Sequence, residues 1–189
     1  MGWQSIIGWM IAAMCFVVAV SMLAPLASLF DLTSMVIVLF AAPAILLMTY
    51  GTRTKMFFVG LYSTVMPRHA QSMDTSQHQQ VARMARSLGQ YALLSGAAGT
   101  FIGCVQMLQN LEDVRSIGPA LALGLLTLLY GFLIKLFVAM PVQYHHLRMA
   151  GADPADFIDH ADALRLIGLM GVSVGVTFFI MLIAMASWA

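Results

Sequence analysis

Long stretches without a charged side chain dominate this chain and decide what it can fold into. The first 30 residues contain no Asp, Glu, Lys or Arg, and another uncharged run extends from Ser87 to Leu111. A helix needs about 20 predominantly apolar residues to cross a bilayer. Charged residues make up only 9% of the chain, against about 25% in ordinary soluble domains. The sequence therefore predicts an all-α polytopic membrane protein.

Five apolar runs are long enough to span a membrane. We expect spans at Ile6–Leu23, Leu32–Tyr50, Leu88–Leu108, Ile117–Met140 and Leu166–Trp188, with Pro141 ending the fourth. Five segments follow: 1–51 with the first two spans, 52–87 as a basic loop, 88–141 with spans three and four, 142–165 with a short helix, and 166–189 with the fifth. The first run is too long for the apolar part of a cleaved signal peptide, so we expect it to be retained.

Basic residues in the loops set the expected orientation. Residues 52–86 contain five Lys and Arg and one acidic residue, Asp74, whereas the neighbouring loops contain none and one. Short loops rich in Lys and Arg stay in the cytoplasm. We therefore expect a cytoplasmic N-terminus and a C-terminus on the opposite side of the membrane.

The polar segments carry further expectations. Apolar residues behind Arg53 and Lys55 recur at helical spacing, which suits a helix lying in the membrane interface: Phe57, Phe58, Leu61 and Val65. Asp153 followed by Pro154 is typical of a helix start. The Asp residues after it are expected on a solvated face.

Histidine and cysteine do not predict a reactive site. His145 and His146 are adjacent, so a helix directs them about 100° apart, and we expect interfacial or solvated side chains. Cys15 and Cys104 lie in apolar runs and are expected to be small buried hydrophobes. The chain has no P-loop, HExxH or GxSxG motif and no GxGxxG after a strand. We expect no enzyme activity, cofactor, metal or nucleic-acid partner.

Small residues mark the third and fourth spans. Gly96, Gly99 and Gly103 form one face that permits close helix approach in lipid, and Gly124 and Gly131 serve the fourth span. Thr100 and Thr127 place single hydroxyls inside apolar runs. Each hydroxyl could bond back to its own helix or could line an ion path where several copies meet.

The block from Gly96 to Pro141 resembles a known family. It reads GAAGTFIGCVQMLQNLEDVRSIGPALALGLLTLLYGFLIKLFVAMP. The sequence is similar to the MotA branch of the MotA/TolQ/ExbB channel family in its Gly, Thr and Pro pattern, with Asn110, Asp113 and Tyr130 also matching. Residues Asp31–Val38 are similar to the start of that branch's second span.

The resemblance implies a proton or sodium channel subunit. Five copies would surround two single-span partners of the MotB/TolR/ExbD type, whose transmembrane Asp takes up the ion. Thr100 and Thr127 would then line the path, and Pro119 and Pro141 would be structural prolines. No span here contains Asp or Glu, so a titrating carboxylate must come from another chain.

Several features depart from the family pattern. Flagellar members have a large cytoplasmic domain where this chain has residues 52–86, and they have no fifth span. The family's Thr-Thr pair is Thr127-Leu128 here. Lys135 shares a helical face with Thr127, and it either snorkels to the inner interface or forms a ring of cations at the inner mouth. The alternative function is a non-conducting oligomeric scaffold with a lipid-filled or plugged centre.

Overall fold

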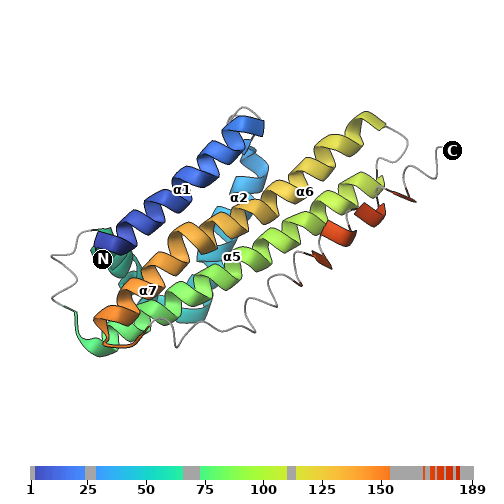
Figure 1. The fold of residues 1–189 in the computed structure, drawn as a ribbon. Coiled ribbons are helices and arrows are strands. Elements are labelled where there is room, and N and C mark those ends of the chain that lie inside the picture. Colours follow the sequence, from blue (N-terminus) through green and yellow to red (C-terminus); the bar gives the residue numbers. More distant parts are fainter. Residues whose placement is uncertain are drawn as a thin grey trace.

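The fold is a set of long helices around one central helix, α5. The computed structural model describes residues 3–23, 29–65, 73–109 and 114–153, and scattered positions between 168 and 183. All regular structure in these residues is helical. The helices are α1 (Trp3–Leu23), α2 (Leu32–Tyr50), α3 (Thr54–Val65), α5 (Thr75–Gln109), α6 (Val114–Ile134) and α7 (Met140–Met149) (Figure 1).

Three helical stretches of the described residues are long and apolar enough to cross a membrane. They are Leu32–Thr64, Thr75–Gln109 and Ile117–Met149, and a shorter apolar helix covers Ile7–Met22. The predicted membrane helix bundle is confirmed. The expected second span coincides with α2. The expected fifth span, like the helix expected to start at Pro154, falls mainly outside the described residues, although its described positions between 168 and 183 are helical.

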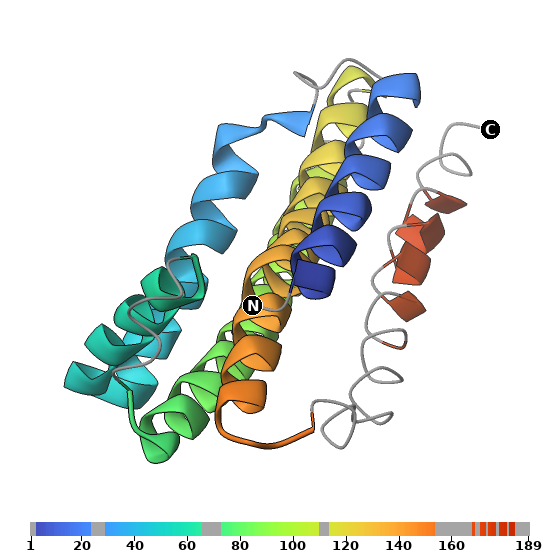
Figure 2. The ribbon, with the colours of Figure 1, turned by 60° about the vertical axis from the view of Figure 1, so that its left-hand side comes forward.

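Helix α5 organises the bundle. It runs antiparallel beside α6 and α7, while α2 and α3 cover another side of it (Figures 1 and 2). Its buried side chains recur at helical spacing from the polar end into the apolar run, including Val81, Ala85, Leu88 and Ala92. Residues 75–87 therefore continue the predicted third span without a break. We call the end of α5 and α6 at Gln109 and Val114 the outer end, following the predicted topology, and the opposite end the inner end.

Helical backbone continues past Pro141, where we expect the fourth span to end, and the end of the span itself stays a prediction. A π-helical turn, η3 (Lys135–Ala139), joins α6 directly to α7, so helical backbone continues to Met149. Proline lacks an N–H donor and usually breaks a helix. Here the wider π-turn precedes it, and Pro141 stands at the start of α7, where proline is tolerated.

Helix α3 packs more deeply than an interfacial helix needs. A 3₁₀ turn, η2 (Gly51–Arg53), links it to α2, and Gly51 has a φ of 56°, a conformation that favours glycine. Phe57 is 3% exposed and belongs to the core cluster with α5 and α2, whereas Phe58 is 57% exposed. The predicted helix forms, and its depth relative to a membrane stays a prediction.

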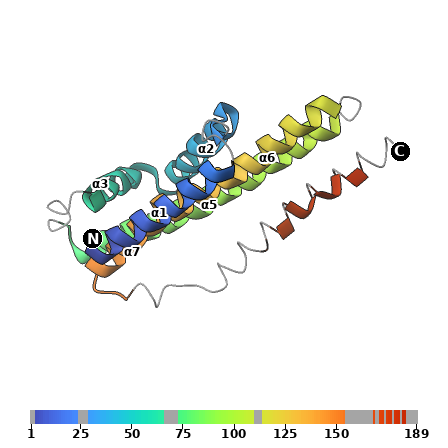
Figure 3. The same ribbon diagram turned by 45° about the horizontal axis from the view of Figure 1, so that its top comes forward.

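The axis of α1 is roughly aligned with those of α5 and α6 (Figure 3), and most of its described side chains are exposed. Cys15 is exposed, so its expected burial is wrong for the single chain, whereas Cys104 is buried as expected. An apolar side chain can face lipid at no cost, and this removes the reason to expect burial. Helix α1 is therefore the element whose position depends on the fewest contacts.

Candidate functional site

The closest backbone approach among the described helices lies between α5 and α6. A Cβ atom added to Gly103 would lie 2.7 Å from the carbonyl oxygen of Ala120 and 2.8 Å from Cα of Gly124. One added to Gly131 would lie 2.6 Å from the carbonyl oxygen of Ala92, and one added to Gly96 would lie 2.8 Å from that of Thr127. These glycines are therefore required for the helices to meet at this distance.

Thr100 and Thr127 lie inside this contact and share one acceptor. The Thr100 hydroxyl donates to the carbonyl of Gly124 at 2.8 Å and has a longer contact, 3.1 Å, with that of Gly96. The Thr127 hydroxyl donates to the same Gly124 oxygen at 2.8 Å. Their exposed fractions are 2% and 0%. In the single chain both hydroxyls thus bond to backbone. The Thr127 hydroxyl bonds to its own helix, whereas the shorter bond of the Thr100 hydroxyl links α5 to α6.

The oxygen atoms of the Thr100 and Thr127 hydroxyls can still accept a hydrogen bond or bind a cation. A threonine hydroxyl has one donor and two acceptor lone pairs. With both hydrogens directed at Gly124, each oxygen can only accept, which suits a water molecule or a cation. The crevice beside Thr100 and Gly124, which Cys104 and Met107 also line, is too narrow in the single chain to hold a water molecule. Whether the threonines line an ion path stays a prediction.

Lys135 lies at the inner end of the α5–α6 contact. A Cβ added to Gly89 would lie 3.2 Å from Cγ of Lys135 and 3.0 Å from Cβ of Ala139. About 30 Å of helix separates Gly89 from Gln109 at 1.5 Å per residue, which is close to the thickness of a bilayer's hydrocarbon core. Whether Lys135 snorkels to the inner interface or forms a ring of cations stays a prediction.

Tyr130 ties the start of α2 to α6. Its hydroxyl donates to the carbonyl of Leu29 and accepts from the backbone N–H of Asp31 at 3.2 Å. Asp31 in turn caps α2, because its carboxylate accepts from the N–H of Ser34 at 2.7 Å. The Ser34 hydroxyl donates to the carbonyl of Leu123 on α6 at 3.3 Å. Tyr130, which matches the family pattern, thus has a structural role in this chain: its side chain connects the start of α2 to α6.

A histidine cluster joins α3, α5 and α7 at the inner end. Nδ1 of His78 and Nδ1 of His146 are 2.7 Å apart, and the ring of His145 meets that of His146 edge to face. The exposed fractions of His78, His145 and His146 are 3%, 6% and 0%. The expectation of solvated histidines is therefore wrong, because α3 and α5 cover the face of α7 that carries them.

Hydrogen bonding fixes the tautomers within the cluster. Nε2 of His146 is 3.1 Å from the carbonyl oxygen of Gly60. A carbonyl only accepts, so Nε2 of His146 carries hydrogen, and in the neutral ring Nδ1 must accept from Nδ1–H of His78.

Asp74 lies just before α5, where the side chain of Ser76 and the N–H of Thr75 lower the pKa of its carboxyl group, with a smaller contribution from His78.

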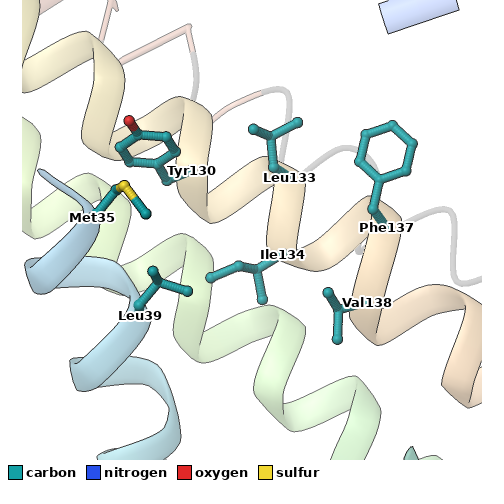
Figure 4. Close-up of a pocket in the computed structure, with 7 residues that line it drawn as sticks. All are labelled: Met35, Leu39, Tyr130, Leu133, Ile134, Phe137 and Val138. Carbon is teal, nitrogen blue, oxygen red and sulfur yellow. The ribbon is translucent and has the colours of Figure 1, made fainter. Parts of the chain in front are cut away.

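An apolar groove separates α2 from α6. It encloses about 270 Å³, and its walls carry almost no polar surface apart from the Tyr130 hydroxyl (Figure 4). The lining side chains are Met35, Leu39, Tyr130, Leu133, Ile134, Phe137 and Val138. A catalytic or cofactor pocket needs convergent polar groups, which this groove lacks. Within the described part of the chain, no group of three or more His, Cys, Asp or Glu side chains could hold a metal ion.

Comparison with known proteins points to one family. The family model for the MotA/TolQ/ExbB proton channel family matches residues 61–150. This segment contains α5, α6, η3 and α7, and hence the glycine contact, both threonines, Lys135, Tyr130 and the prolines Pro119 and Pro141.

Individual relatives match shorter parts of the chain. The chain is 38% identical over 71 residues to the chemotaxis protein PomA of Vibrio alginolyticus, covering 38% of this chain and 28% of that protein. It is 40% identical over 80 residues to motility protein A of Cereibacter sphaeroides, covering 42% and 30%. The aligned region thus spans less than a third of the length of these relatives. Residues 61–150, slightly less than half of the chain, are therefore similar to the MotA/TolQ/ExbB proton channel family.

Proposed function

We propose that this chain is a subunit of a proton or sodium channel complex that couples the ion gradient to motion of a partner protein. One observation carries the proposal: the family match includes the α5–α6 pair, whose glycines and threonines form one continuous contact. PomA and motility protein A, two relatives to which part of the chain is similar, are named for chemotaxis and motility. The complex would reside in a bacterial inner membrane, with the N-terminus in the cytoplasm and the C-terminus in the periplasm.

The ion-binding carboxylate would come from the partner. The apolar runs 32–50, 88–109 and 117–140 contain no Asp or Glu. A proton or sodium ion crossing hydrocarbon needs an oxygen ligand or an acid to receive it. A MotB/TolR/ExbD-like partner with one span and a membrane-embedded Asp would supply that group. Five copies of this chain around the partner would present Thr100 and Thr127 at mid-depth.

A non-conducting scaffold is the second candidate, and specific side chains favour it. Leu128 replaces one hydroxyl of the family's pair and is 3% exposed, packed beside Gly96. Lys135 adds a positive charge at the inner end of the same helix. A ring of such charges opposes cation flow. In this reading the centre of the oligomer holds lipid or a plug.

A flux assay separates the two functions. The purified complex, with the co-expressed single-span partner, is reconstituted into proteoliposomes, and proton and sodium influx are followed separately under an imposed gradient. A channel subunit predicts that Thr100→Val and Thr127→Val each reduce influx, because valine keeps the shape of threonine without the hydroxyl. Thr49→Val is the matched control, since that hydroxyl bonds to Ile45 and Tyr91 on the α2 side of the bundle.

The outcomes are distinct. Influx that requires the partner and falls only with the α5–α6 variants supports the channel. Absent influx with an intact oligomer supports the scaffold, whereas influx that is unchanged in all three variants would show a path that does not use these threonines. Native mass spectrometry of the same sample gives the copy number, for which the proposal requires five copies and two partners.

A further inference from the structure

Two carbonyl groups at the inner end of α6 lose their helical donors. In an α-helix the carbonyl of Phe137 would accept from the N–H of residue 141, which is proline and has none. The N–H of Met140 bonds to the carbonyl of Lys135, five residues back, rather than to that of Leu136. The π-turn and Pro141 therefore deprive Leu136 and Phe137 of their usual partners.

Such a carbonyl is costly where lipid replaces water. A backbone polar group without a partner in hydrocarbon costs several kcal/mol, so other donors usually satisfy it. The proline at this position belongs to the family pattern, and the π-turn before it is the kind of local distortion that recurs at functional sites. A donor from another helix is the expected remedy.

Helix α1 provides that donor. The indole Nε1 of Trp9 donates to the carbonyl oxygen of Phe137 at 3.1 Å. The ring of Phe137 also meets the rings of Trp9, at 6.3 Å between centroids and 78° between planes, and of Phe16, at 6.1 Å. Trp9 is 41% exposed, and α1 approaches the other described helices much less closely than α5 and α6 approach each other. Phe137 is therefore the main anchor of α1.

We propose that Trp9 is a positioning residue, whose indole N–H replaces the donor that Pro141 lacks and so couples α1 to the π-turn beside Lys135. The functional importance of this coupling rests on the proposed channel function, because the π-turn lies at the inner end of the proposed path. The hydrogen-bond relation itself does not depend on conduction. A shift of α1 would change the support of the Phe137 carbonyl and with it the bend between α6 and α7.

A double-mutant cycle on the purified full-length protein tests the relation. Trp9→Phe keeps a ring against Phe137 and removes the N–H. In the native background it should lower the unfolding midpoint by about 2–4 °C. In a Pro141→Ala background, where the introduced alanine can donate its backbone N–H to Phe137, the same substitution should cause no further shift. Phe16→Leu, which alters ring packing alone, should give the same shift in both backgrounds.

Hydrogen exchange gives a second readout that survives a failure of Pro141→Ala to fold. Amides in the peptide 136–146 should exchange several-fold faster in Trp9→Phe than in the native chain, and Phe16→Leu should leave this ratio near one. Equal thermal shifts of Trp9→Phe in both backgrounds would overturn the proposal, as would unchanged exchange. Both readouts are made without an ion gradient, so a protein that proves not to conduct would overturn the proposed function and leave this inference standing.

Discussion

Replacing Gly103 by alanine tests whether α5 and α6 are as close as the structure shows. The added Cβ would lie 2.7 Å from the Ala120 carbonyl oxygen and 2.8 Å from Cα and N of Gly124, whereas ordinary contact begins at 3.4 Å. All three neighbours are backbone atoms. They cannot rotate away as a side chain can, so one helix must move along its length.

The size of the effect follows from two opposing contributions. Overpacking a tight contact costs about 1–3 kcal/mol, while exchanging glycine for alanine inside a helix gains about 0.5–1 kcal/mol. Gly8 on α1 has no atom within 4 Å of an added Cβ, so Gly8→Ala should show the gain alone. We expect Gly103→Ala to be less stable than Gly8→Ala by about 1–3 kcal/mol.

Unfolding by sodium dodecyl sulfate, followed by far-ultraviolet circular dichroism of the protein in detergent micelles, measures this difference. Gly89→Ala should fall between the two variants, because its added Cβ meets Cβ of Ala139 at 3.0 Å and the flexible side chain of Lys135 at 3.2 Å. If Gly103→Ala proves as stable as Gly8→Ala, the helices are further apart than the structure has them, and the reasoning fails.

Three further predictions use the same unfolding assay. Tyr130→Phe should lose about 1–2 kcal/mol, because its hydroxyl bonds to Leu29 and Asp31; an unchanged midpoint would show that this tie is absent in the membrane protein. Asp31→Ala should cost about 1 kcal/mol by uncapping α2, whereas Asp31→Asn, which keeps a capping oxygen, should be nearly neutral; equal losses would point to the charge instead. Lowering the pH from 7.5 to 5.5 should destabilise the native chain. Histidines of the unfolded chain each bind a proton below about pH 6.5, but the two Nδ1 atoms at 2.7 Å hold one proton between them. The stabilisation is therefore present above about pH 6.5 and is lost as the pH falls, by at most about 1.4 kcal/mol per pH unit and proton. His146→Gln should flatten this slope, and an equally steep slope in that variant would contradict the geometry.

The positions of the helices were largely predictable, because a long run of residues without a charged side chain indicates a membrane span. Leu32–Tyr50 coincides with α2, and the glycine spacing of Gly96, Gly99 and Gly103 indicated the helix face that meets α6. The continuation of the helix past Pro141 could not be predicted from the sequence. Proline in water ends a helix, but in this chain a π-turn and the indole of Trp9 accommodate it, and the indole lies far from Pro141 in the sequence.

The histidine cluster escaped prediction for a different reason. The adjacency of His145 and His146 gives the angle between these two side chains alone. The partner of His146 is 68 positions earlier, on α5. A signal was present: His78 falls on the stripe that continues through Val81, Ala85 and Leu88, and all four are buried. A histidine in register with a buried apolar stripe faces the protein interior.

Helix α5 is uninterrupted over 35 residues, about 52 Å at 1.5 Å per residue, so about 20 Å of it lies beyond a hydrocarbon core of about 30 Å. Helix α3 packs against this projecting part where Gly60 meets Val81, and α7 contacts it through the histidine cluster. A straight helix transmits load along its axis with little bending. Force applied at its polar end would therefore reach the α5–α6 glycine contact without an intervening hinge. The projecting part of α5 could thus transmit force to the membrane helices even though residues 52–86 hold no large domain.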